Sequence, residues 1–359
     1  MQDKNSRLVS NNFDLLRLLF AGTVCLVHAY QLSEIEELKI IGIYLSSKIA
    51  VEAFFIVSGF LIFMSYERSS SVSSYIEKRA RRILPAYIVV VILCALGFLF
   101  ISTLSYGGYF SSDWISYIVA NLSFLNFIQH SLPGVFEENK FNAVNGALWT
   151  LKIEVMFYLS VPLFVYLFRR FSCLPVIAFF YISSLVYVFT LSLLEERSGN
   201  VLYTILSRQL PGQLSYFMAG AYFYYFLHVF EENAKYFVSF SILVLAINTI
   251  FPLTVIEPFA IATLVIFFGL FLYLGNFGKF GDISYGVYIL HFPIIQTFIN
   301  EGWFSEKPWV FLISIIAVTT VGAMIMWHFV EKRFLHRGGH YVLATASHVE
   351  ITPNKASNP

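Results

Sequence analysis

Ten apolar runs, each close to the length that crosses a bilayer as a helix, dominate this chain of 359 residues. About 20 helical residues are needed to cross about 30 Å of hydrocarbon. The runs lie near residues 13–30, 49–66, 83–104, 147–168, 172–194, 210–230, 236–252, 257–275, 283–300 and 309–329. Helices satisfy their backbone polar groups within lipid. The pattern therefore predicts an all-α, polytopic integral membrane helix bundle of about ten transmembrane helices.

The composition agrees with lipid as the solvent. Hydrophobic residues make up 58% of the chain and charged residues 13%, about half the roughly 25% charged residues of a soluble domain. Membrane lipids are thus expected partners. The 23 Lys and Arg residues almost equal the 22 Asp and Glu residues, so no basic surplus exists to neutralise a nucleic-acid backbone. The three cysteines, Cys25, Cys94 and Cys173, lie within apolar runs and indicate no disulfide framework.

Charge bias sets the orientation of the bundle. An eleventh candidate run, residues 114–129, is short and contains Asn121 and Asn126. If it does not span, most Lys and Arg residues lie on one side, which the positive-inside rule assigns to the cytoplasm. Both termini are then cytoplasmic, and residues 105–146 form the longest outer segment. We expect residues 114–129 to be re-entrant or to lie on the interface.

One membrane domain is predicted over residues 1–337, and no second soluble domain is expected. The remaining residues, 338–359, form a polar tail with two prolines. Such a composition cannot bury enough apolar surface to order itself, so the tail is predicted to be disordered.

Arg17 and His28 are two ionisable residues that the first predicted membrane helix must accommodate. They are eleven residues apart on one predicted helix, so they share a face and lie about 16 Å apart along its axis. Intramembrane charges usually face a cavity or a partner. The alternative is an interfacial arginine and a structural histidine.

Three further ionisable side chains fall within predicted spans. Glu52 and Glu154 lie in the outer halves of the second and fourth helices, and His291 lies about 12 Å into the ninth. A carboxylate beside an imidazole orients it and raises its basicity, which favours Glu52 as a partner of His28. The alternatives are a water-exposed Glu52, an interfacial Lys152–Glu154 pair and a His291 tied to a kink at Pro293.

Four cations precede the third helix, in an inner loop that contains Arg79 and Arg82. Guanidinium groups bind phosphate through paired hydrogen bonds, so this loop is a candidate phosphate clamp. Equally, such clusters set the orientation of any membrane protein.

Together these segments resemble the acyltransferase-3 family of membrane acyltransferases, over about Asn12 to Phe334. The matching elements are Arg17 with His28 (arginine, ten residues, histidine), Glu52–Leu61 (acidic-x-Phe-Phe-x-x-Ser-Gly-Phe-Leu), Arg79 with Arg82 (R-x-x-R), Trp149–Tyr158, Ser284–His291 and Val330–Phe334. The departures are Thr150 for serine, Val155 for a frequent second acid, Arg333 for proline and Glu52 for aspartate. We expect a member without a Ser-Gly-Asn-His hydrolase-type domain after the last helix.

The resemblance implies a membrane O-acyltransferase in the bacterial plasma membrane. It takes acetyl from cytoplasmic acetyl-CoA to a hydroxyl of an extracytoplasmic or lipid-linked glycan, such as lipopolysaccharide O-antigen or exopolysaccharide, and needs no metal. Its implied roles are a catalytic His28 oriented by Glu52, donor-binding Arg17, Arg79 and Arg82, and a substrate path along Glu154, His291, Trp149 and Tyr285.

Two other classes of membrane protein remain as alternatives. A transporter or flippase of a glycan or lipid precursor also buries ionisable groups, but it predicts inverted repeats, and none is visible. A polysaccharide polymerase or ligase gives no reason for the cytoplasmic arginine pair. The sequence leaves open the acceptor and the length of the acyl group.

Overall fold

The computed structural model describes residues 7, 8 and 10–335, and these contain helices and connecting segments but no strand. The predicted all-α fold is therefore confirmed. The tail predicted over 338–359 lies outside the described residues. The long helices are α2 (Phe13–Ser33), α4 (Ser47–Glu67), α5 (Val72–Gly97), α8 (Trp149–Phe171), α9 (Cys173–Ser198), α11 (Leu210–Tyr225), α12 (Leu227–Asn248), α13 (Glu257–Leu270), α14 (Ser284–Asn300) and α15 (Pro308–Met326).

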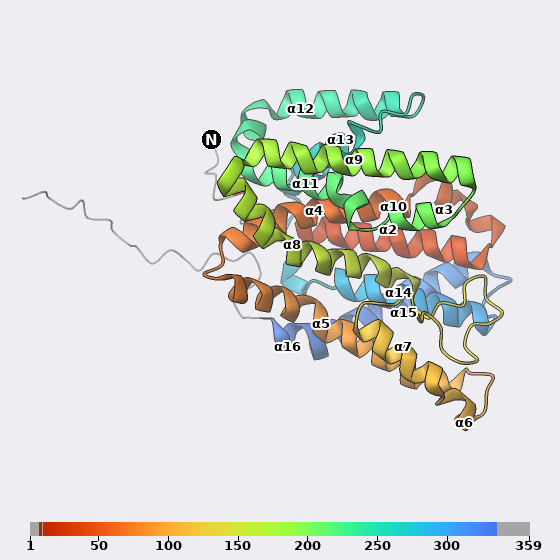
Figure 1. Ribbon diagram of the computed structural model, residues 1–359. Helices are drawn as coiled ribbons and strands as arrows, with labels where there is room; N and C mark the ends of the chain where they lie inside the picture. The colour runs from red at the N-terminus through yellow and green to blue at the C-terminus, as the bar shows by residue number, and fades with distance from the viewer. Residues whose placement is uncertain (1–6, 9, 336–359) are drawn as a thin grey trace, which may run out of the picture.

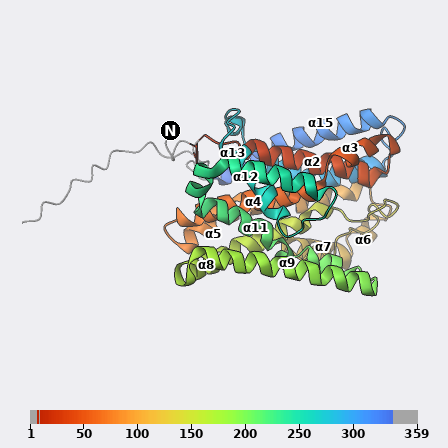
Figure 2. The same cartoon turned by 90° about the horizontal axis from the view of Figure 1, so that it is seen from above.

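The long helices lie side by side along one direction and form a bundle (Figures 1 and 2). Helix α2 packs against α4 and α14, and α4 packs against α11. Short helices occupy the connections, namely α3 (Lys39–Tyr44), α6 (Tyr106–Tyr109), α7 (Ser112–Leu122), α10 (Leu202–Ser207) and α16 (Lys332–Phe334). A π-helical turn, Trp327–Glu331, joins α15 to α16.

Each predicted apolar run coincides with one long helix. Six segments are both long and apolar enough to cross a membrane, namely Phe13–Ser33, Glu36–Glu67, Val72–Phe100, Gly146–Phe171, Cys173–Ser198 and Pro308–Phe334. The apolar helix α13 is shorter, with 14 residues. These findings support a polytopic membrane bundle.

Helix α5 begins earlier than the apolar run predicts. The prediction placed Arg79 and Arg82 in an inner loop before residue 83, but α5 starts at Val72 and contains both. Its start is capped by the Ser71 hydroxyl, which accepts from the Ser74 amide at 3.1 Å, and Lys and Arg are good helix formers. The loop prediction was wrong, and both arginines are held on a helix.

Helix α7 occupies the segment that was predicted to be re-entrant. It has 11 residues, about 16 Å of helix, too short to cross a membrane. The Trp114 indole donates to the Ala95 carbonyl at 2.7 Å, and the Tyr87 hydroxyl donates to the Asn121 carbonyl at 2.8 Å. Helix α7 thus runs alongside α5, from the C-terminal end of α5 toward the middle of α5, as in Figure 1. The Asn121 amide donates to the Gln129 carbonyl at 2.9 Å where the chain turns back, which favours the re-entrant arrangement.

Two glycines let α4 and α11 approach closely. A Cβ on Gly59 would collide with the Phe217 carbonyl oxygen, and one on Gly220 would collide with the Ile56 carbonyl oxygen. Small residues allow this kind of backbone contact between membrane helices. The packing fixes which face of α4 points toward the site.

Candidate active site

A cavity lies between α2, α4, α5, α8 and α14. It holds about 830 Å³ of open space, including its mouth. Helix α4 supplies an apolar wall of Val51, Phe54, Phe55, Val57, Leu61 and Ile62, with Ser58 as the polar exception. The other walls carry most of the polar groups. A ligand with one apolar side and one anionic end suits this lining.

Three predicted donor-binding arginines line the cavity together. Arg17 comes from α2, and Arg79 and Arg82 come from α5. The two arginines of α5 are three residues apart, so they project from neighbouring positions on one face. The structure thus brings Arg17, Arg79 and Arg82 to one region.

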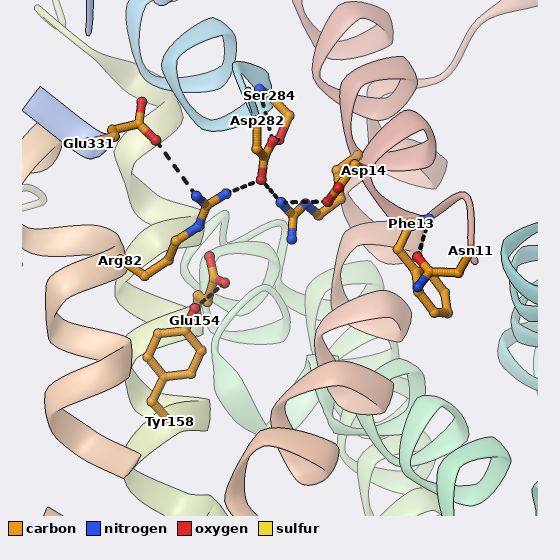
Figure 3. A network of polar contacts seen from close by, with 10 residues as sticks. Asn11, Phe13, Asp14, Arg82, Glu154, Tyr158, Asp282, Ser284 and Glu331 are labelled. Carbon is orange, nitrogen blue, oxygen red and sulfur yellow. Dashed lines mark hydrogen bonds and ion pairs between the residues drawn. The ribbon is translucent and has the colours of Figure 1, made fainter. Parts of the chain in front are cut away.

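A buried carboxylate already holds two of these arginines (Figure 3). Asp282, just before α14, forms ion pairs with both Arg17 and Arg82, and its side chain is 1% exposed. Its Oδ1 also accepts from the Ser284 amide at 3.2 Å. Two further carboxylates stand at the edge of the cluster, Asp14 at 3.4 Å from Arg17 and Glu331 at 3.8 Å from Arg82.

These carboxylates were missed as site residues. Asp282 precedes the start of α14 by two residues, where acidic residues favour the helix N-terminus, and its bonds to Ser284 fit that role. Nothing in the local sequence shows that its second oxygen bridges two other helices. Glu331 lies on the π-helical turn, a feature that often marks functional sites.

Arg79 differs from its two neighbours. Its Nε is buried and has no hydrogen-bond partner, and its guanidinium lies 5.7 Å from the Tyr158 ring centroid. Among residues 7–8 and 10–335, no carboxylate oxygen lies within 4.0 Å of it. A buried donor without a partner costs free energy unless a ligand satisfies it. Of the three arginines, Arg79 is therefore the one that no carboxylate of the described residues holds.

Two of the four predicted path residues line the cavity. Glu154 accepts a hydrogen bond from the Tyr158 hydroxyl at 2.6 Å (Figure 3), and the Tyr285 hydroxyl donates to the Ile83 carbonyl at 3.1 Å. Trp149 is the first residue of α8 and is half-buried. It and His291 are not among the residues that line the cavity.

His28 and His291 form a directly bonded pair. Nδ1 of His28 lies 2.9 Å from Nε2 of His291, and the rings stack with centroids 5.1 Å apart. The Nδ1 of His291 lies 3.3 Å from the Val287 carbonyl oxygen, which can only accept. In neutral rings His291 therefore accepts at Nε2, and His28 donates from Nδ1. This leaves Nε2 of His28 unprotonated, as a general base requires.

Aromatic side chains stand between this pair and the cavity. Tyr288 lines the cavity, and its ring centroid lies 5.8 Å from that of His291 and 5.6 Å from that of Phe54. Its hydroxyl is held by Thr150 Oγ1 at 2.7 Å. His291 thus contacts Tyr288, which is itself part of the cavity wall.

Glu52 is not the partner that the structure gives to His28. Its carboxylate lies 3.7 Å from Lys48 Nζ and next to Tyr216 of α11. Gly59, which contacts α11, comes seven residues after Glu52, so the two residues lie about 20° apart around α4. Ser58, which lines the cavity, lies about 120° from Glu52 around the same helix. Glu52 therefore faces α11. Its predicted depth says nothing about this direction, and its catalytic role stays a prediction.

No three His, Cys, Asp or Glu side chains converge as metal ligands would in the described part of the chain.

The site consists of two polar centres, an arginine–aspartate cluster and a histidine pair. Arg17 and His28 mark them on α2, about 16 Å apart along its axis. The centres can act on one reaction if a long ligand bridges them.

Comparisons with known proteins cover almost the whole chain. A family model described as an acyltransferase domain matches residues 10–328. An O-acetyl transferase of Shigella phage Sf6 is 31% identical over 342 residues, which cover 91% of this chain and 97% of that protein. Nodulation protein 10 of Rhizobium leguminosarum bv. viciae is 26% identical over 344 residues, covering 90% of this chain and 92% of that protein. No solved structure matches.

Proposed function

Because the chain belongs to the acyltransferase-3 family of membrane acyltransferases, we propose that it transfers acetyl from acetyl-CoA to a hydroxyl of a glycan outside the bacterial plasma membrane. The family membership makes the chain an acyltransferase and decides against the transporter hypothesis. The phage relative's name supports O-acetyl transfer in particular. The single observation that carries the mechanism is the bonded pair His28–His291, 2.9 Å apart.

The donor enters from the cytoplasmic side, where the arginines line the cavity. Arg79 lines the cavity and has no carboxylate partner among the described residues, so its guanidinium binds a phosphate of the donor. Asp282 already neutralises part of the charge of Arg17 and Arg82, so these two arginines attract the phosphates less strongly than Arg79 does. The uncharged arm of the donor then packs against the apolar wall of α4 and extends toward Tyr288.

His28 acts as the general base in this proposal. Its Nε2 takes the proton of the acceptor hydroxyl while that oxygen attacks the thioester carbonyl carbon. The carbon–sulfur bond breaks, the acetyl group is left on the acceptor oxygen, and the proton passes from His28 to the departing thiolate. The Nδ1–H of His28 donates a hydrogen bond to Nε2 of His291, and this bond keeps the His28 ring oriented. Tyr288 or Phe54 must move for the thioester to reach His28.

The acceptor hydroxyl is presented from the outer side. The segment between α7 and α8 lies next to the histidine pair on that side. Gln296 of α14 donates to the Ala143 carbonyl at 2.9 Å, and Lys140 bonds Glu34 after α2 at 2.5 Å. A histidine with an unprotonated ring nitrogen is a common general base for a hydroxyl group.

The test is acetyl transfer in membranes that carry the protein. Radiolabelled acetyl-CoA and the host's surface glycan are added to membranes with wild type, His28→Ala or His228→Ala at equal protein levels. His228 is an exposed histidine of α12, away from the cavity lining, and serves as the matched control. Label in the glycan with wild type and the control, but none with His28→Ala, is the expected result. Transfer by His28→Ala at the wild-type rate would refute the mechanism.

A further inference from the structure

Pro293 creates an unpaired carbonyl next to the histidine pair. A proline within a helix has no N–H for the carbonyl four residues earlier, and Pro293 lies inside α14. The carbonyl deprived in this way is that of Ile289. It lies in the turn that leads to His291, and Ile289 is buried.

Asn145 supplies the missing donor from another part of the chain. Its Nδ2 donates to the Ile289 carbonyl oxygen at 2.8 Å, and the asparagine is 5% exposed. Its Oδ1 accepts from the Ala147 amide at 3.2 Å, at the turn that leads into α8. One buried side chain thus joins the start of α8 to the turn of α14 between Ile289 and Pro293.

The residue after Asn145 completes this contact. A Cβ on Gly146 would lie 2.6 Å from the Phe292 ring, so glycine lets the chain pass directly over that ring. The Phe292 ring in turn meets the His28 ring edge to face, with centroids 5.7 Å apart. This turn of α14 is therefore held by a hydrogen bond at Ile289 and by backbone contact at Phe292.

We propose that Asn145 is a positioning residue, which fixes the turn of α14 between Ile289 and Pro293 so that His291 and Phe292 hold His28. The inference rests on the proposed function only in taking His28 as catalytic. The bond between Asn145 and Ile289 itself does not depend on that function, so two separate readouts apply.

The decisive experiment is a double-mutant cycle of Asn145→Ala with Pro293→Ala. Alanine at 293 returns an N–H to the Ile289 carbonyl, so the Asn145 donor is no longer required there. In the wild-type background, Asn145→Ala leaves a buried acceptor unsatisfied and is expected to lower kcat by about 5- to 150-fold. The KM for acetyl-CoA stays near its wild-type value, because Asn145 does not line the cavity. In the Pro293→Ala background the same substitution has a much smaller effect.

Asn139→Ala is the matched control. Asn139 is also an outer-segment asparagine that donates to an α14 carbonyl, that of Gln296, at 3.1 Å. That carbonyl is not the one freed by Pro293, so Pro293→Ala is expected not to alter the effect of Asn139→Ala. Suppression of both asparagine variants would mean a general loosening of α14 and would overturn the proposal.

The melting temperature of the detergent-solubilised protein is the second readout. It reports the hydrogen bond even if acetyl-CoA proves to be the wrong donor, in which case wild type itself shows no transfer. Independent effects of Asn145→Ala and Pro293→Ala on the melting temperature would refute the bond. The positioning role would be refuted by two results together, provided that wild type transfers acetyl. Pro293→Ala would suppress the effect of Asn145→Ala on the melting temperature, and Asn145→Ala alone would leave kcat unchanged.

Discussion

Replacing His291 with phenylalanine tests whether the histidine pair works through its hydrogen bond or through packing. Phenylalanine keeps a flat ring against His28, whose centroid lies 5.1 Å from that of His291, and the site is fully buried. It removes the Nε2 that accepts from His28 at 2.9 Å. Leaving a buried donor unsatisfied costs about 1–3 kcal/mol. The lost orientation of His28 therefore lowers kcat by about 5- to 150-fold.

The assay compares initial rates of acetyl transfer for wild type, His291→Phe and His291→Ala at equal protein levels. Both variants lose the bond, and alanine also leaves a cavity. The expected order is wild type, then phenylalanine, then alanine, with the KM for the donor unchanged. A phenylalanine variant with the wild-type kcat would refute the reasoning, because His291 would then act only as a packed ring.

Four further predictions concern the surrounding structure. Arg79→Ala is expected to raise the KM for acetyl-CoA by about 10- to 150-fold through loss of a charge-assisted bond, and an unchanged KM in initial-rate assays contradicts it. Asp282→Asn, which leaves two arginines without their shared carboxylate, is expected to cost about 3–5 kcal/mol, seen as a lower melting temperature in detergent. Gly59→Ala, with its Cβ against the Phe217 carbonyl, is expected to cost at least about 1–3 kcal/mol, by the same measurement. Glu52→Gln is expected to change kcat by less than about fivefold, because Glu52 lies beside Lys48 and Tyr216 and not beside His28. A larger loss of kcat, of the size expected for a lost bond to His28, would contradict this.

The helices could be predicted because the signal for a membrane helix is long and local. Each of the ten apolar runs coincides with a long helix of the described residues, and the short length of run 114–129, together with the charge bias, led to the prediction that it does not span. The start of α5 was misplaced because its first turns are polar and carry Arg79 and Arg82. Apolarity marks where a helix meets lipid, and not where its hydrogen bonds begin.

The depth of the site residues within the bundle could be predicted, but the direction in which each side chain points from its helix could not. His28 and Glu52 were both placed in the outer half of the bundle, and a pair between them followed from that depth alone. The partner that the structure shows is His291, 263 positions further along the chain. Which residues face each other depends on the rotation of each helix, and for α4 the glycine contact with α11 sets that rotation. No pattern within a single segment reveals this.

The aspartate cluster changes how donor binding must be understood. Three arginines in one region suggest an open anion site, yet the buried Asp282 bridges Arg17 and Arg82. Buried cations are costly without a partner, so this carboxylate lets the bundle hold two of them when no donor is bound. The charge of these two arginines is therefore partly neutralised before a phosphate arrives. Arg79 lines the same cavity, and no carboxylate of the described residues lies within 4.0 Å of it, so the affinity for the donor is expected to depend most on that arginine.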